Sequence, residues 1–204
     1  MAKLTLTSFL TLDGVMQAPG GPNEDPSGNF QHGGWVVPYF DPDLGAIMFD
    51  IFSRASAFLL GRGTYDIFSA HWQKVTDPGN LVATKLNSLP KFVASRTQTN
   101  FDWNNTKHVA EVTEDLESIK SQFEGELQVH GSCGLAQTLI EHNLIDEYRL
   151  FIFPVALGTG KRLFNSFSAP AGLELMGARS MRTGVTYNVY RPTQEFQTGS
   201  FELE

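Results

Sequence analysis

The chain has little cysteine: Cys133 is its single thiol in 204 residues. One thiol excludes an internal disulfide framework and any zinc site built from several sulfur ligands. Long apolar runs are also missing, and none approaches the roughly 20 residues that span a bilayer. The opening segment alternates Leu and Thr instead of forming the apolar block of a signal peptide. We therefore expect a cytoplasmic protein with no membrane partner.

Basic residues are sparse as well. Lys and Arg total 15 against 22 Asp and Glu, which gives a formal net charge of -7, and the basic residues are scattered along the chain. A nucleic-acid-binding surface needs clustered positive charge, so we expect no nucleic-acid partner. An anionic cofactor is still compatible with this composition, because local amides and a few basic side chains decide its binding. We expect one globular domain over residues 1–204.

Three common functional motifs are absent. The sequence has no Ser-His-Asp order of the kind that would indicate a hydrolase. It also has no ligand spacing that would indicate a metal site, so we expect no metal. A full G-x-G-x-x-G motif is also missing, which argues against an ordinary Rossmann domain.

The sequence does contain a regular alternation of strand and helix patterns. Short apolar or alternating segments, each followed by a turn or a helical apolar spacing, predict strands at residues 3–10, 57–60, 91–94, 108–110, 126–130 and 146–153. Such an alternation favours a mostly parallel sheet covered by helices on both faces. Two further strands, Leu173–Met181 and Val185–Arg191, flank a Thr-Gly turn and predict an antiparallel hairpin. The expected class is a three-layer α/β/α fold with a C-terminal antiparallel hairpin.

Two strand-to-helix turns carry glycine where a phosphate group could approach the backbone. The first turn contains Gly61, Arg62, Gly63 and Thr64, and the second contains Gly131, Ser132, Cys133 and Gly134. Glycine permits close approach, and the helix that follows offers unpaired N–H groups. Two such turns on one parallel sheet predict a dinucleotide pyrophosphate across the strand ends. The alternative is that the glycines only make tight turns and allow close packing.

Ser95 and Arg96 follow the predicted strand at 91–94. A hydroxyl and a guanidinium at a strand end suit a ribose 2′-phosphate, which favours NADP over NAD. The alternative is a solvated arginine in a loop.

These motifs occur in a recognisable order along the chain. Leu12-Asp13-Gly14 comes first, the two glycine turns and Ser95-Arg96 follow, and the block Pro154–Phe164 comes last. In this order the chain resembles the dihydrofolate reductase-like family, most closely the branch related to the reductase domain of the bifunctional deaminase-reductase of riboflavin synthesis. The resemblance covers nearly the whole chain. It implies bound NADPH, a heterocyclic small-molecule substrate and a homodimer.

The resemblance also implies roles for individual residues. Gly61 to Thr64 and Gly131 to Gly134 would hold the cofactor phosphates, and Ser95 with Arg96 would hold the 2′-phosphate. Ser132 and Cys133 stand where the family often has a second glycine and another small residue. Asp13 and Gly14 would lie near the nicotinamide. The substrate or nicotinamide pocket would be bordered by Pro154, Leu157 and Gly158.

The proton source is open in the sequence. Dihydrofolate reductases place a carboxylate on the helix before the Gly-Arg-x-Thr strand, and here that helix offers Asp43 and Asp50 on a flank beside its apolar stripe. Asp43 can equally stabilise the helix dipole, and Asp50 can pair with Arg54 on the surface. Asp50 and Asp13 are the candidate catalytic residues.

Three further side chains have two interpretations each. Trp35, with neighbouring aromatic residues, either forms a wall for a flat heterocycle or anchors a long loop. His130 either donates a proton or packs beside the glycine turn. Cys133 at a helix start is expected to have a lowered pKa, unless it is only a small residue at a crowded turn.

The leading hypothesis is a reductase that transfers hydride from NADPH to a pterin-, pyrimidine- or flavin-like molecule. The alternatives are a non-catalytic NADP-binding or sensing module, and an oligomeric scaffold that pairs through its C-terminal hairpin.

Overall fold

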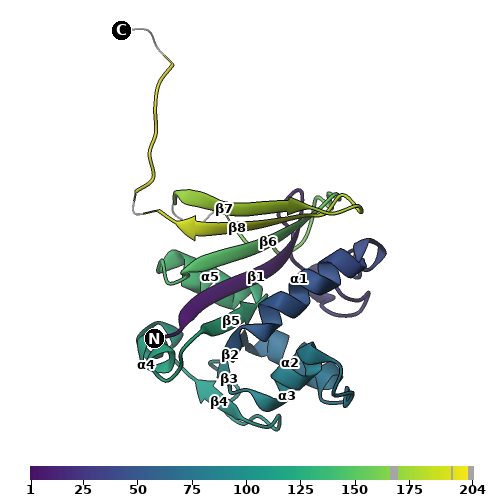
Figure 1. Ribbon diagram of the computed structural model, residues 1–204, viewed down its shortest axis with the longest axis vertical. Helices are drawn as coiled ribbons and strands as arrows, with labels where there is room; N and C mark the ends of the chain where they lie inside the picture. The colour runs from purple at the N-terminus through teal and green to yellow at the C-terminus, as the bar shows by residue number, and fades with distance from the viewer. Residues whose placement is uncertain (166–169, 194, 202–204) are drawn as a thin grey trace.

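The computed structural model describes residues 1–165, 170–193 and 195–201. Within these residues one eight-stranded sheet has the order β4-β3-β2-β5-β1-β6-β8-β7 (Figure 1). Its strands are β1 (Lys3–Thr11), β2 (Ala55–Gly61), β3 (Lys91–Ala94), β4 (Thr106–Val109), β5 (Glu126–His130), β6 (Glu147–Phe153), β7 (Leu173–Ser180) and β8 (Thr186–Pro192). Strands β1 to β6 pair in parallel, and β8 pairs antiparallel with both β6 and β7. The predicted sheet and hairpin are confirmed.

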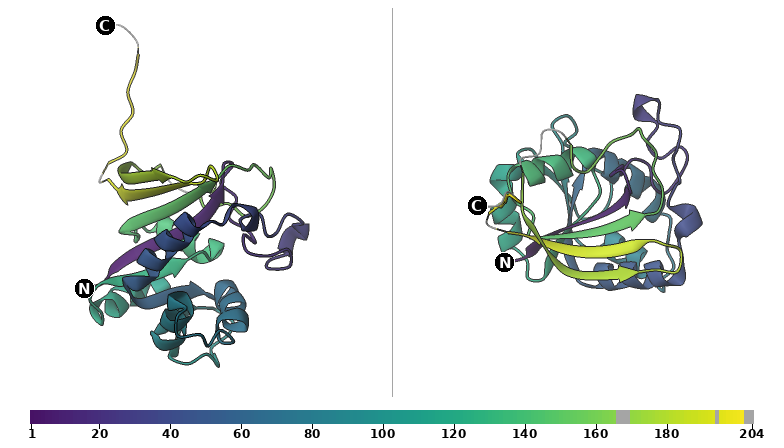
Figure 2. Two further views of the ribbon diagram at one scale, coloured as in Figure 1. Left: turned by 45° about the vertical axis from the view of Figure 1, so that its right-hand side comes forward. Right: turned by 90° about the horizontal axis from the view of Figure 1, so that it is seen from above.

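Helices cover both faces of the parallel part of the sheet (Figure 2). On one face lie α1 (Pro42–Ser53), α2 (Arg62–Trp72) and α3 (Leu81–Ser88), and on the other lie α4 (Val112–Ser121) and α5 (Cys133–Glu141). Phe52 of α1 packs with Phe58 and Val93 on the first face. Leu139 of α5 packs with Val129 on the second face. The three predicted layers are therefore present.

Local sequence signals explain where α1 begins. The Asp41 carboxylate accepts a hydrogen bond from the Leu44 amide at 2.8 Å, and proline occupies the first helical position. Both features stabilise a helix start. Leu44, Ile47 and Ile51 are buried, as their helical spacing predicts.

The C-terminal hairpin is the least covered part of the sheet. All eight residues of β7 are exposed, whereas β8 is half-buried along most of its length. A register shift between Leu175 and Gly177 interrupts their pairing. No helix within the described ranges is long and apolar enough to cross a bilayer.

Strands β2 and β5 are direct neighbours, but the chain continues from them in opposite directions across the sheet. From β2 it goes on to β3 and β4 at one edge, and from β5 it goes on to β6 on the other side of β1. After β2 the chain enters α2 on one face, and after β5 it enters α5 on the opposite face. The two connecting turns therefore diverge at the carboxyl ends of adjacent strands. In open α/β sheets such a reversal point opens a crevice in which ligands bind.

Candidate functional site

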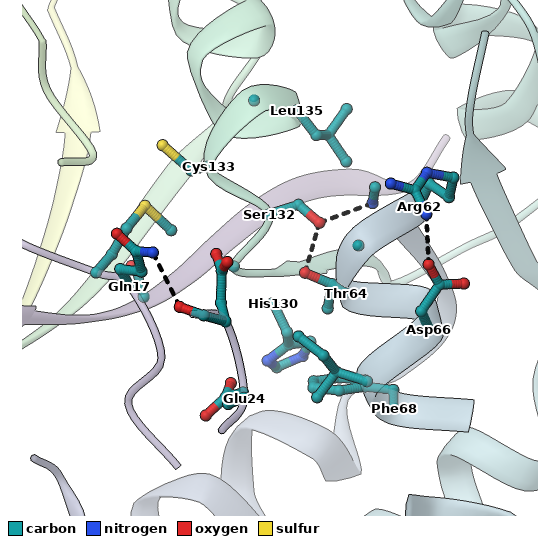
Figure 3. Close-up of a pocket in the computed structure, with 18 of the residues that line it drawn as sticks. Gln17, Glu24, Arg62, Thr64, Asp66, Phe68, His130, Ser132, Cys133 and Leu135 are labelled. Atoms are coloured by element: carbon teal, nitrogen blue, oxygen red, sulfur yellow. Dashed lines mark hydrogen bonds and ion pairs between the residues drawn. The ribbon is translucent and has the colours of Figure 1, made fainter. Parts of the chain in front are cut away.

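A groove of about 1870 Å³ runs along the carboxyl ends of β1, β2, β3 and β5 (Figure 3). Its wall contains both glycine turns, the Ser95-Arg96 pair and parts of the loop at residues 16–27. Sites for a single small molecule usually occupy about 300–1,000 Å³. The groove therefore has room for a dinucleotide and a second ligand.

The two glycine turns contact each other through Ser132. Its Oγ accepts a hydrogen bond from the Gly61 amide at 3.0 Å and donates one to Thr64 Oγ1 at 2.6 Å (Figure 3). A Cβ at Gly61 would lie 2.5 Å from Ser132 Oγ, so only glycine fits there. Gly131 has φ +74°, a conformation that favours glycine. The turns predicted from the sequence thus form one continuous surface.

The helix starts at this surface are suited to an anion. Neither α2 nor α5 has a side-chain hydrogen bond from its N-cap residue. The first backbone N–H groups of a helix have no hydrogen-bond partner within the helix, and they lie at the positive end of the helix dipole. Two such starts beside one groove can bind a pyrophosphate from both sides.

The basic residues of the groove differ in their partners. Arg62 donates from Nη1 to Asp66 at 2.6 Å, and this pair is exposed. Arg96 is exposed on the groove wall and has no carboxylate partner among the described residues. Ser95 is buried, and its Oγ accepts from the Gln98 amide at 2.9 Å, which orders the loop that carries Arg96. Arg96 is therefore a free cation at the end of β3.

Asp13 lies outside the groove. Its carboxylate accepts hydrogen bonds from Thr11 Oγ1 at 2.5 Å and from the amides of Leu157 and Gly158 at 3.1 and 2.8 Å. The Thr11 hydroxyl is the largest cause that lowers the pKa of Asp13 to about 2, and the two amides act in the same direction. Asp13 thus joins the loop after β6 to the end of β1, and it is not suited to donate a proton.

The acidic residues of α1 also face away from the groove. Asp50 pairs with Arg54 Nη1 at 2.7 Å, and Asp43 lies 3.4 Å from Arg179. The same helix presents Met48 and Phe52 to the groove. For Asp50 the structure therefore shows the surface ion pair and not a position at the site.

None of the predicted substrate residues lines the groove. Trp35 is buried, donates from Nε1 to the Gln17 carbonyl at 2.8 Å and packs edge-on against Phe153. This geometry matches the interpretation that Trp35 anchors the loop. Pro154, Leu157 and Gly158 lie in the loop that Asp13 holds, and none of them is a groove residue.

The loop at residues 16–27 supplies polar groups that the sequence analysis did not single out. Glu24 lines the groove, where its carboxylate accepts hydrogen bonds from the amides of Gly20 and Gly21 at 2.5 and 3.1 Å. Burial raises the pKa of Glu24 despite these bonds. The glycine and proline residues of this segment predict a loop, but they carry no signal for the direction of its individual side chains.

The expected lowered pKa of Cys133 is wrong. Burial raises the pKa of this thiol, although Lys161 acts in the opposite direction. Its Sγ lies 3.4 Å from the Arg162 carbonyl and 3.2 Å from Gln137 Nε2. The interpretation of Cys133 as a small half-buried residue at a crowded turn fits these contacts.

His130 packs beside the glycine turn, which agrees with the second of its two interpretations. Its imidazole stacks on Phe52 with 4.4 Å between ring centroids, and the side chain lines the groove floor. Burial is the largest cause that lowers the pKa of His130 to about 3, and Arg149 adds to it. At neutral pH the imidazole is uncharged.

The sheet order, its two helical layers and its C-terminal hairpin define a dihydrofolate reductase-like fold. A putative riboflavin biosynthesis protein from Shewanella sp. PV-4 matches with a TM-score of 0.70 and 20% identity over 95% of this chain and 100% of its own. A pyrimidine reductase-like protein from Corynebacterium diphtheriae NCTC matches with a TM-score of 0.61 and 11% identity over 95% of this chain and 93% of its own. Dihydrofolate reductase from Enterococcus faecalis, complexed with NADP(H), matches with a TM-score of 0.60 and 13% identity over 94% and 97%.

The chain belongs to the RibD C-terminal domain family, which its sequence matches over residues 2–187. The uncharacterized protein YyaP of Bacillus subtilis (strain 168) is 28% identical over 190 residues, which are 92% of this chain and 94% of that protein. The resemblance inferred from the motifs is thus confirmed. Family and fold together suggest a reductase.

Proposed function

We propose that this protein is an NADPH-dependent reductase that acts on a pterin-, pyrimidine- or flavin-like small molecule. The proposal depends on the contact of the two glycine turns through Ser132. This contact lies at the carboxyl ends of the neighbouring strands β2 and β5, from which the chain continues to opposite sides of the sheet. This junction places two uncapped helix starts beside one groove that is large enough for two ligands.

The groove residues fit a dinucleotide phosphate. The first N–H groups of α2 and α5 would hold the pyrophosphate, and the absence of a Cβ at Gly61 leaves room for Ser132 to join both turns. Arg96 would pair with the 2′-phosphate, since its guanidinium is exposed and unpaired among the described residues. When bound, NADPH would supply the hydride.

The protein would contribute orientation and exclusion of water. Met48 and Phe52 give the groove an apolar wall against which a flat ring can pack. Glu24, with its raised pKa, is the groove carboxyl best suited to hold a proton near a substrate. The relatives named above as reductases support this class of substrate. Its identity and the homodimer stay predictions.

The experiment is a thermal-shift titration with NADPH and NADH on the wild type and two variants. A ligand that binds only the native state raises its stability by mass action. We expect a larger rise with NADPH than with NADH, and we expect Arg96→Ala to weaken NADPH about tenfold or more while leaving NADH unchanged. Arg179→Ala removes the same charge outside the groove and serves as the matched control.

Equal weakening of both cofactors by Arg96→Ala would remove Arg96 from the 2′-phosphate site. If neither cofactor stabilises the wild type, the dinucleotide proposal fails.

A non-catalytic NADP-binding module is the second candidate. One observation favours it: α1 turns Asp43 and Asp50 away from the groove and presents Met48 and Phe52 instead. NADPH oxidation, followed by absorbance with a panel of pterins, pyrimidines and flavins, separates the two. Binding of NADPH without turnover on any of them would favour the module.

A further inference from the structure

Beneath the groove, a row of buried polar side chains runs along β5. Glu126, Gln128 and His130 occupy alternate positions of this strand and therefore share one face of the sheet. Arg149 donates to both carboxylate oxygens of Glu126, at 2.8 and 2.7 Å. A bidentate pair of this kind holds the carboxylate in a fixed orientation.

Two hydrogen-bond acceptors determine the orientation of the Gln128 side-chain amide. Its Nε2 lies 2.6 Å from the carbonyl of Ile51 and 2.6 Å from Glu126 Oε2. A carbonyl and an ionised carboxylate can only accept hydrogen bonds, so the Gln128 atom between them must be the NH₂ group. Its Oε1 therefore faces His130, whose Nε2 lies 3.0 Å away.

This contact determines the tautomer of His130. An amide oxygen cannot donate, so His130 Nε2 must carry the hydrogen. A charged imidazole is unfavourable here, because the residue is 8% exposed and its ring is stacked on Phe52. The neutral ring has one N–H, so Nδ1 is left as an acceptor. No residue in the described part of the chain bonds to Nδ1, and His130 lines the groove.

Thr7 stands beside His130 on the neighbouring strand. The two residues are register partners in the parallel pair of β1 and β5, and both line the groove. Thr7 is 4% exposed, and its Oγ1 is buried without a hydrogen-bond partner among the described residues. The hydroxyl is closed off from the groove in this rotamer, so a ligand carbonyl reaches it only after rotation about the Cα–Cβ bond of Thr7. An unpaired buried hydroxyl is unfavourable, so a ligand that pairs with the rotated group gains affinity.

We propose that His130 and Thr7 bind an amide group of the ligand in the groove, with His130 Nδ1 accepting from its N–H and Thr7 Oγ1 donating to its C=O. The choice of ligand rests on the proposed function. The amide is either the carboxamide of the nicotinamide ring or the lactam edge of a heterocyclic substrate, and both offer the same donor and acceptor pair.

The first experiment tests the acceptor without any ligand. Long-range ¹H–¹⁵N correlation spectra at neutral pH report which imidazole nitrogen carries the hydrogen. We expect His130 to show a protonated Nε2 and an unprotonated Nδ1. A protonated Nδ1 would overturn the inference while leaving the proposed cofactor site untouched.

The second experiment measures affinity by calorimetry for two matched ligand pairs. The first pair is NADP⁺ and its 3-acetylpyridine analogue, in which a methyl group replaces the carboxamide NH₂. The second pair is flavin mononucleotide and its N3-methyl derivative, each added to protein saturated with NADP⁺. For the pair whose amide is bound, we expect the methyl member to bind the wild type about tenfold more weakly, since it lacks one hydrogen bond.

The variants assign that difference to particular atoms. His130→Phe keeps a ring stacked on Phe52 and should bind both members of the discriminated pair equally. Thr7→Val keeps the side-chain shape and should weaken both members about equally. Thr5→Val is the matched control, because Thr5 Oγ1 is also buried on β1 and has no hydrogen-bond partner in the described part of the chain, but Thr5 does not line the groove. It should bind as the wild type does.

The pair that discriminates identifies the source of the amide. Equal affinity within both pairs in the wild type, or unchanged discrimination in His130→Phe, would overturn the inference even if NADP⁺ binds. No binding of NADP⁺ at all would overturn the proposed function, and this inference with it.

Discussion

Replacing Gly61 by alanine tests the junction on which the proposed site depends. The added Cβ would lie 2.5 Å from Ser132 Oγ, 2.7 Å from Ser132 Cβ and 3.4 Å from Leu135 Cβ. The backbone of Gly61 has φ -75°, so alanine is not strained by its own conformation. The cost therefore comes from displacing Ser132. Overpacking of this kind destabilises a protein by about 1–3 kcal/mol, and loss of the two Ser132 hydrogen bonds adds about 1 kcal/mol for each bond.

Three further variants isolate that contact. Gly63→Ala lies in the same turn, where a Cβ meets nothing within 4 Å, and it should leave stability unchanged or slightly raised. Ser132→Gly removes the clashing atoms and frees a residue with φ 62°, so the double variant Gly61→Ala/Ser132→Gly should be about as stable as Ser132→Gly alone. Urea unfolding followed by circular dichroism gives all four free energies.

The two alanine variants should also differ in their affinity for NADPH. Gly61→Ala displaces the turn that opens α5, so NADPH should bind more weakly than to Gly63→Ala. The reasoning fails if Gly61→Ala is as stable as Gly63→Ala. It fails equally if the effects of Gly61→Ala and Ser132→Gly simply add in the double variant.

Two other perturbations concern groups outside this junction. The amides of Leu157 and Gly158 donate to different oxygens of Asp13, so Asp13→Asn sets its NH₂ group against one of them in either orientation. Urea unfolding should show a loss of roughly 1–3 kcal/mol, with NADPH affinity unchanged within error. A large loss of affinity would instead place Asp13 at the site. His130 has a depressed pKa of about 3, so the unfolded chain binds its proton first and wild-type stability falls as pH drops below 6.5. In His130→Phe the fall between pH 7.5 and pH 5 should be about 2 kcal/mol smaller, and equal slopes in both proteins would contradict the buried neutral imidazole.

Local patterns made most of the fold predictable. The period of apolar residues and the glycine turns lie within short windows, so the strands and the helices α1, α2, α4 and α5 could be assigned from them. Helix α3, at Leu81–Ser88, was not assigned, although Asn80 caps it by accepting from the Ala83 amide at 3.0 Å. The order of the strands could not be predicted from local patterns, because β5 inserts between β2 and β1 through contacts between segments that are distant in the sequence.

The site was predictable to a lesser extent. The glycine turns and Ser95-Arg96 were found because a strand end that opens a helix is a local signal, and the structure does bring these residues to one groove. Asp50 sits on the flank of α1, where its position on a helical wheel allows either a groove or a surface role. The position of Arg54 four residues later resolved this ambiguity in favour of the surface.

Ser132 shows how a departure from a family pattern can be compensated in three dimensions. A serine at φ 62° is less favourable than glycine, by about 1–2 kcal/mol for the left-handed conformation. In return its Oγ pairs with both Gly61 and Thr64, which glycine cannot do, and two hydrogen bonds of about 1 kcal/mol each offset the cost. The turns are therefore held together before any ligand arrives, and a preorganised surface loses less entropy on binding. The residue that weakened the motif in the sequence is the one that joins the two halves of the site.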